Sequence, residues 1–284
     1  MTNVDQFESV FRSADKPVFH LAPVDASTVV VVSDRTGESA QAFADAVRRL
    51  LHGVPSVQQV QVLPGEDWRT TGELLEAVQK AGASLVCTHR NLCSDGWRWP
   101  HSLGEHLDVL TQVSHAPVLV CPHPELVAPE RFAERGTDRV MAVTDHLAGD
   151  DRLVSWALAL TERGGRLLLS HVEDERSFDR MIEVIAKIPA LDTDTARRTI
   201  RAQLLKEPHD YIRSCREGIE RIGSHVTVEE IVTMGHRLAD HVRLVKEHDV
   251  DVLVLNTRDD DQLAMHGLAY PLAVELREIP LLLL

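Results

Sequence analysis

One spacing occurs twice in this chain and constrains its fold more than any other feature. Gly104 is followed thirteen residues later by Pro117, and Gly267 is followed thirteen residues later by Pro280. Each glycine opens an expected helix, and each proline introduces a short apolar strand, VLVC or LLLL. An apolar strand and a polar loop precede the glycine in both places. The repeat predicts a tandem duplication of one folding unit.

Further anchors extend the match between the two copies. VVVVSD ends at Asp34 and VMAVTD ends at Asp145, while Gly65 and Gly235 each follow a later strand. The first Asp-to-Gly interval is 31 residues and the second is 90 residues. The second copy therefore holds about one more strand and helix, together with a further helical insertion. We expect the first copy to be a trimmed version of the second.

Apolar strands alternate with helical stripes along both copies. Residues 28–33 form a run rich in β-branched residues, of the kind found in a strand buried on both faces of a sheet. This alternation predicts an α/β protein with two tandem open parallel-sheet domains, of which the first lacks one strand-helix module. We expect an N-terminal extension with a short amphipathic helix at 1–24, the trimmed first domain at 25–123, a linker at 124–136, and the second domain at 137–284 with a helical insertion at 173–223.

Charge and apolar content exclude several classes of partner. The formal net charge is −14, and nucleic acid or anionic membrane surfaces require a net basic face. No apolar window approaches the roughly 18 residues that span a bilayer, and the first twenty residues do not resemble a secretory signal. The four cysteines lack a regular framework, which suits a reducing compartment. We expect a cytoplasmic protein.

The chain resembles the universal stress protein family in the order of these features: an Asp after the first strand, a Gly after the third, and a final strand, glycine loop, helix, proline and strand. The resemblance covers about 27–121 and 137–284. It implies a flavodoxin-like fold, also described as adenine nucleotide alpha hydrolase-like, and a role in stress response. It also implies ATP held by the first-strand Asp and by a G-x2-G-x9-G-(S/T) loop, whose backbone N–H groups close on phosphate.

Both copies depart from that phosphate loop. In the second copy Asn256 and Asp259 replace the first two glycines, Leu268 replaces the hydroxyl residue, and 259–261 are three aspartates. In the first copy Thr88 and Asn91 replace the glycines, and Glu105 replaces the hydroxyl residue. A carboxylate beside a triphosphate costs on the order of 1 kcal/mol or more. We therefore expect two decayed phosphate loops.

We therefore predict a non-catalytic binding or adaptor protein that requires no cofactor and has an unknown protein or small-molecule partner. The alternative is an adenine-nucleotide-binding protein or slow ATPase that uses the second domain only, with ATP or adenosine bound at low affinity. The candidate nucleotide cleft consists of Asp145, His171, Gly235, Asn256 and Gly267. Turn chemistry and helix starts also explain the aspartates and glycines of both copies, and this structural explanation is the more common one for Asp34 and the glycines.

A second group of residues has metal-ligand chemistry. It consists of Cys87, His89, Cys93, Cys121 and His123, and zinc prefers thiolate and imidazole ligands. Their spacing is not a standard zinc pattern, and Cys87 and Cys121 lie in apolar strands where free cysteine acts as a small hydrophobe. We therefore predict no metal. The other histidines, including His241, are expected to be solvated.

No common catalytic motif occurs. G-x-S-x-G, the P-loop and G-x-G-x-x-G are all missing from the sequence. The sequence therefore favours a protein without enzymatic activity, although a site built from dispersed residues would leave no such motif.

The resemblance also implies how the copies assemble, because relatives of this type commonly pair their last strands across a two-fold axis. The strands at 118–121 and 281–284 are expected to pair across an internal two-fold axis, giving an intramolecular pseudo-dimer and hiding the apolar C-terminus. The insertion carries more apolar surface than one sheet face requires. That surplus is expected to cover the first domain or to join a second chain in a homodimer.

Overall fold

The computed structural model describes residues 17–144, 147–257 and 267–284. The helix expected within the first sixteen residues, the site candidate Asp145 and the aspartates at 259–261 lie outside this part of the chain. Residues 17–121 are called the first half below, and residues 139–284 the second half.

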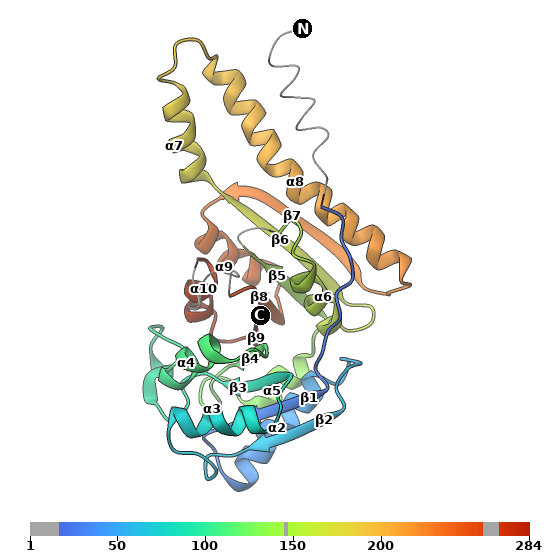
Figure 1. Ribbon diagram of the computed structural model, residues 1–284, viewed down its shortest axis with the longest axis vertical. Coiled ribbons are helices and arrows are strands. Elements are labelled where there is room, and N and C mark those ends of the chain that lie inside the picture. Colours follow the sequence, from blue (N-terminus) through green and yellow to red (C-terminus); the bar gives the residue numbers. More distant parts are fainter. Residues whose placement is uncertain (1–16, 145–146, 258–266) are drawn as a thin grey trace.

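Nine strands of the described residues form one sheet in the order β2-β1-β3-β4-β9-β8-β5-β6-β7 (Figure 1). The first half contributes β1 (Thr28–Val32), β2 (Gln59–Leu63), β3 (Leu85–His89) and β4 (Val118–Cys121). The second half contributes β5 (Arg139–Val143), β6 (Arg166–Asp174), β7 (Thr227–Gly235), β8 (Val252–Leu255) and β9 (Leu281–Leu283). Every neighbouring pair is parallel except β4 and β9, which confirms a mostly parallel α/β sheet.

The two halves join where β4 runs antiparallel to β9. Val118 pairs with Leu283, and Val120 pairs with Leu281. The predicted pairing of the two proline-introduced strands is confirmed. It places the apolar C-terminal strand in the middle of the sheet, so the strand edges of the described sheet are β2 and β7.

The trimming of the first half is visible in the strand order. In the second half β6 lies between β5 and β7, whereas in the first half β2 pairs directly with β1. Among the described residues the first half has no strand equivalent to β6. It therefore lacks one strand and its crossover helix, as the short Asp34-to-Gly65 interval predicts.

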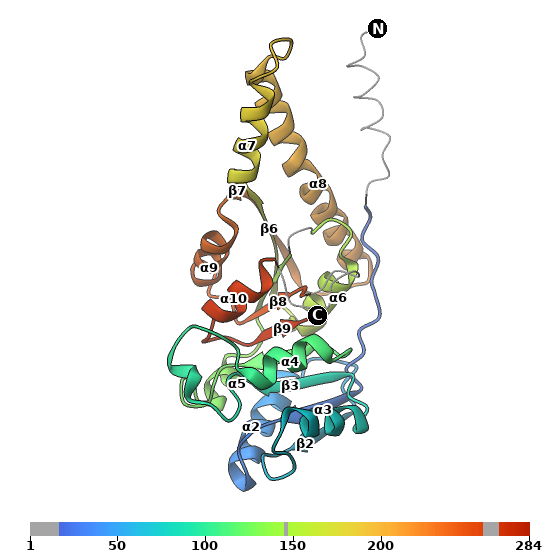
Figure 2. The same cartoon turned by 60° about the vertical axis from the view of Figure 1, so that its left-hand side comes forward.

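Helices cover both faces of the sheet (Figures 1 and 2). One face carries α2 (Gly37–Leu50), α5 (Pro129–Arg135), α6 (Asp151–Leu160) and α8 (Thr193–Arg221). The other carries α3 (Thr71–Lys80), α4 (Glu105–Val113), α9 (Arg237–Glu247) and α10 (Ala269–Glu275). Local sequence sets several helix starts. Thr70 and Glu73, for example, form a reciprocal capping box at the start of α3.

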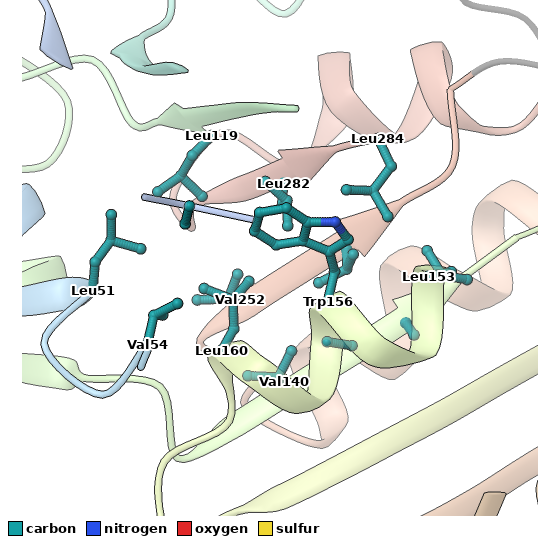
Figure 3. Close-up of a cluster of buried hydrophobic side chains, with 14 of the residues drawn as sticks. Leu51, Val54, Leu119, Val140, Leu153, Trp156, Leu160, Val252, Leu282 and Leu284 are labelled. Atoms are coloured by element: carbon teal, nitrogen blue, oxygen red, sulfur yellow. The ribbon is translucent and has the colours of Figure 1, made fainter. Parts of the chain in front are cut away.

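The core is continuous across the junction of the halves (Figure 3). Trp156 of α6 lies in one cluster with Leu51 and Val54 from the first half and with Leu119 and Leu282 from the two joining strands. Because apolar burial is the main favourable term in folding, each half stabilises the other.

The segment expected as a linker contains a packed helix. Pro129 is the first residue of α5, where its missing N–H costs nothing. Phe132 is buried, and its ring meets the ring of Phe43 edge to face at a centroid distance of 6.5 Å. Arg135 contacts the buried Asp251 before β8. The segment at 124–136 thus packs on the first half and is tied to the second.

The insertion consists of α7 (Glu175–Ile185) and the 29-residue α8. The C-terminal part of α8 buries an apolar group on the sheet of its own half: Tyr211, Ile212, Cys215 and Ile219. The N-terminal part of α8 projects away from the sheet together with α7 (Figures 1 and 2). Four apolar side chains of α7 and of the loop between the two helices are exposed: Met181, Val184, Ile188 and Leu191. The insertion covers the second half rather than the first, and its role in a homodimer stays a prediction.

Residues 17–24 lie along the second half, where the Phe19 amide donates to Ser214 Oγ and the Ala22 amide donates to Ser155 Oγ.

No helix of the described residues combines the length and the apolar character needed to cross a bilayer.

Candidate functional site

Asp34 follows β1, and both of its carboxylate oxygens contact the protein. His89 Nε2, at the end of β3, lies 3.0 Å from Oδ1, and the Cys93 amide donates to Oδ2 at 2.7 Å. Burial alone would raise the pKa of Asp34. The hydrogen bond and charge of His89, with the Cys93 amide and Arg35, outweigh it and bring the pKa to about 2. Asp34 therefore holds the strand tips of the first half together.

The phosphate-loop position of the first half is filled by the chain itself. Gly104 precedes α4 with a φ of 103°, and a Cβ there would lie 2.8 Å from the Cα of Asn91. The Asn91 amide donates to the carbonyl of Leu103 at 2.6 Å. Gly65 serves a similar close approach, since its Cβ would lie 2.7 Å from the carbonyl carbon of Asp34. Both glycines are explained by backbone packing.

Ser33, His89 and Asp34 do not form a nucleophilic triad. Ser33 Oγ lies 3.3 Å from His89 Nε2, the same nitrogen that faces Asp34. A catalytic histidine contacts its nucleophile and its carboxylate through opposite ring nitrogens. Here the other nitrogen, Nδ1, donates to the Arg90 carbonyl at 3.2 Å. Ser33 and His89 are also completely buried, so a substrate cannot reach them.

The cysteines and histidines considered as metal ligands have separate environments. Cys87 and Cys121 are completely buried, and burial raises the pKa of both thiols. Cys93 is exposed. His123 stacks on Trp97, with ring centroids 5.1 Å apart, and burial lowers the pKa of His123 to about 4. Within the described residues no three His, Cys, Asp or Glu side chains are grouped to hold a metal ion.

In the second half, two of the predicted cleft residues make contacts within the protein. His171 is buried, and its Nε2 lies 3.2 Å from Glu173 Oε2. Asn256 follows β8, and its side-chain amide donates at 3.0 Å to Asp150, the N-cap of α6. The structure does not bring these two side chains into contact with each other.

A pocket of about 740 Å³ lies beside the ends of β6 and β7, between α9 and α10. It is bounded by Gly267, a predicted site residue. Its apolar lining is Leu238, Ala239, Val242, Leu268 and Pro271, and its polar lining is Asp174, Arg176, His236, Arg237 and Glu275. Ligands of open α/β sheets bind beside the carboxyl ends of the strands, and this pocket has a volume in the usual range of ligand sites.

Gly235 adjoins this pocket and shapes the start of α9. A Cβ at Gly235 would collide with the carboxylate of Asp240, which accepts the His236 amide at 2.7 Å. Arg237, the residue after His236, has its Nη2 3.8 Å from Glu173 Oε1. The glycine thus lets a carboxylate cap the helix that forms one pocket wall.

Sequence reasoning missed most of the pocket lining. His236 and Leu268 directly follow Gly235 and Gly267, two glycines predicted from the sequence as site candidates. Asp174 and Arg176 were missed because β6 continues to Asp174, into the segment assigned to the insertion. The expectation that His241 is solvated is wrong. It is 1 % exposed and donates from Nδ1 to the Arg237 carbonyl at 2.7 Å.

Comparisons with known proteins agree with this architecture. Residues 136–268 match the model of the universal stress protein family. A universal stress protein from Archaeoglobus fulgidus DSM 4304 has the same fold, with a TM-score of 0.52 and 12% identity, over 92% of this chain and 96% of that one. A functionally unknown protein from Pseudomonas aeruginosa PAO1 matches with a TM-score of 0.46 and 15% identity, over 90% of this chain and 81% of that one.

The search of curated proteins finds no match. The family match covers most of the second half, from the residue after α5 to the residue before α10, and includes all of the pocket lining except Pro271 and Glu275. Residues 136–268 of the chain thus form a universal stress protein domain.

Proposed function

We propose that this universal stress protein binds a small molecule without catalysis, in the pocket between α9 and α10 of the second half. The observation that carries the proposal is the contrast between the halves. The strand tips of the first half are occupied by Asp34, His89 and Asn91 in contact with one another or with the backbone. In the second half, by contrast, the described residues beside the ends of β6 and β7 line an open pocket of about 740 Å³.

The lining favours an adenosine-like ligand over ATP. The lining combines apolar side chains with both cations and carboxylates, so an uncharged heterocycle with hydroxyl groups suits it. Three aspartates, Asp259 to Asp261, precede Gly267 in the sequence and oppose phosphate charge. The first half acts in this proposal as a structural partner that binds no nucleotide.

The second candidate function is binding of an adenine nucleotide, with or without slow hydrolysis. It is favoured by Arg176, His236 and Arg237, which supply cationic or donor groups at the pocket. The first candidate requires a pocket that holds adenosine, whereas the second requires one that also holds phosphate groups. A comparison of adenosine binding with ATP binding therefore separates them.

Titration calorimetry with adenosine and ATP tests the proposal. We expect adenosine to bind more tightly than ATP. The change Ala239→Trp, on the α9 wall of the pocket, is expected to abolish adenosine binding, while Glu247→Trp on the same helix leaves it unchanged because Glu247 is outside the lining. Binding that survives Ala239→Trp would place the ligand elsewhere.

A second set of variants tests the role of charge. Replacing Asp259, Asp260 and Asp261 by serine is expected to strengthen ATP binding by about tenfold for each 1.4 kcal/mol recovered, with no effect on adenosine. Sub-micromolar ATP binding to the unmodified protein would overturn the proposal in favour of the nucleotide-binding candidate.

A further inference from the structure

Arg90 directly follows β3 and crosses from the first half to the second. Its side chain is completely buried, and Nη2 donates to the carbonyls of Ala273 and Leu276, each at 2.9 Å. These carbonyls belong to the C-terminal end of α10. The last carbonyls of a helix have no partner within the helix, so the Arg90 guanidinium supplies hydrogen-bond donors that the helix itself does not provide.

A reciprocal contact holds the same end of α10. Arg277, just beyond the helix, donates from Nη1 to the carbonyl of Trp97 at 3.0 Å. Trp97 stacks on His123, whose ring meets that of His89 edge to face at 5.4 Å. The end of α10 is therefore fixed on two sides by the strand-tip loops of the first half.

Burial of this guanidinium is costly. Nε and Nη1 of Arg90 have no hydrogen-bond partner among the described residues, and no acid there pairs with it. Burial and the neighbouring Arg277 lower the pKa of Arg90 to about 9. A hydrophobic residue of similar size often matches or exceeds the stability of such a buried charge. What a hydrophobic residue cannot reproduce is the pair of directed hydrogen bonds.

The same short helix forms a wall of the second-half pocket. Leu268 and Pro271, at its start, and Glu275, at its end, line the pocket. We infer that Arg90 is a positioning residue through which the first half fixes α10, and with it the ligand pocket of the second half. The structural part of this inference stands on the contacts of Arg90, and its effect on ligand binding rests on the proposed function.

Hydrogen exchange on the full chain tests the structural part. In Arg90→Met the amides of α10, including that of Leu276, are expected to exchange about tenfold faster, while those of α9 are unchanged. The matched control is Arg35→Met, which removes a guanidinium that pairs with Asp34 and Glu125 and does not reach α10. If Arg90→Met fails to fold, Arg277→Ala, at a half-buried position, tests whether contacts with the first half fix the end of α10. Unchanged α10 exchange in the folded variant would overturn the inference.

The ligand arm uses adenosine as the probe. Arg90→Met is expected to weaken adenosine binding by about tenfold although Arg90 does not line the pocket, while Arg35→Met leaves it unchanged. If faster exchange in α10 leaves adenosine affinity unaltered, the link from helix to pocket is refuted. If adenosine does not bind the unmodified protein, the proposed function fails, and the exchange result still decides whether Arg90 fixes α10.

Discussion

At the scale of single residues, Asp34 shows how a side chain typical of a ligand site can serve the fold. Its carboxylate is largely buried, and its two oxygens face His89 and the Cys93 amide. These contacts favour the charged form and bring the pKa of Asp34 to about 2. An ionised carboxylate that stabilises the native state makes stability depend on pH, because the contacts are lost on protonation.

The first prediction concerns Asp34→Asn. Its folded pKa is depressed, so its contribution is fully present above the unfolded value near 3.9 and is lost as the pH falls through about 2. We expect the variant to lose about 2 kcal/mol of unfolding free energy at pH 7, and the difference from wild type to shrink between pH 4 and pH 2. Urea titrations across this range measure it, with the half-exposed Asp45→Asn as control. A constant difference down to pH 2 would refute the assignment.

Glycine substitutions provide the second prediction. Gly65→Ala should destabilise the protein by about 1 to 3 kcal/mol, because its Cβ meets the Asp34 backbone. Gly72→Ala, in the first turn of α3, should stabilise by about 0.5 to 1 kcal/mol, because its Cβ would meet only Thr70 Oγ1 at an ordinary contact distance of 3.9 Å. Thermal unfolding of the two variants compares them directly. Equal effects would mean that Gly65 is not held against Asp34.

At the scale of elements, the sequence predicts what depends on local pattern. Strand and helix order and the thirteen-residue repeat follow from apolar periodicity, glycine and proline. The pairing of the strands at 118–121 and 281–284 follows from the family resemblance. The helix within 124–136 was missed because Pro129 was read as a linker signal, although proline also starts helices. Arg90 was missed because its partners, the carbonyls of α10, lie more than 180 residues away.

The α7–α8 arm gives the third prediction. Ile212→Ala should cost about 2 to 5 kcal/mol, because Ile212 is completely buried against the sheet. Val184→Ser, on the projecting α7, should change stability by less than about 0.5 kcal/mol, since Val184 is 62 % exposed. Urea unfolding distinguishes them. If Val184→Ser lost much unfolding free energy at high protein concentration but not at low concentration, a second chain would cover the arm.

At the scale of the whole molecule, one sheet and one shared core make the halves interdependent. The antiparallel junction of β4 and β9 also sets their directions. The strands of the two halves run in opposite senses, so the strand ends of the first half lie beside the strand starts of the second. This arrangement brings Arg90 to the end of α10, just before β9 begins.

The fourth prediction is a single cooperative unfolding transition. Variants that retain only Trp68, in the first half, or only Trp156, in the second, should report the same urea midpoint by fluorescence. The remaining tryptophans are replaced by phenylalanine in each variant. Two separate midpoints would show that the halves unfold independently in spite of the shared core in Figure 3.

The projecting arm also determines how the molecule moves in water. With 29 residues and a rise of about 1.5 Å per residue, α8 is about 44 Å long, comparable to the diameter of a small domain. Since much of this length extends beyond the sheet, friction is greater than for a sphere of equal volume. The protein should sediment more slowly and elute earlier from a sizing column than a compact monomer of the same length, so an early elution does not by itself indicate a dimer.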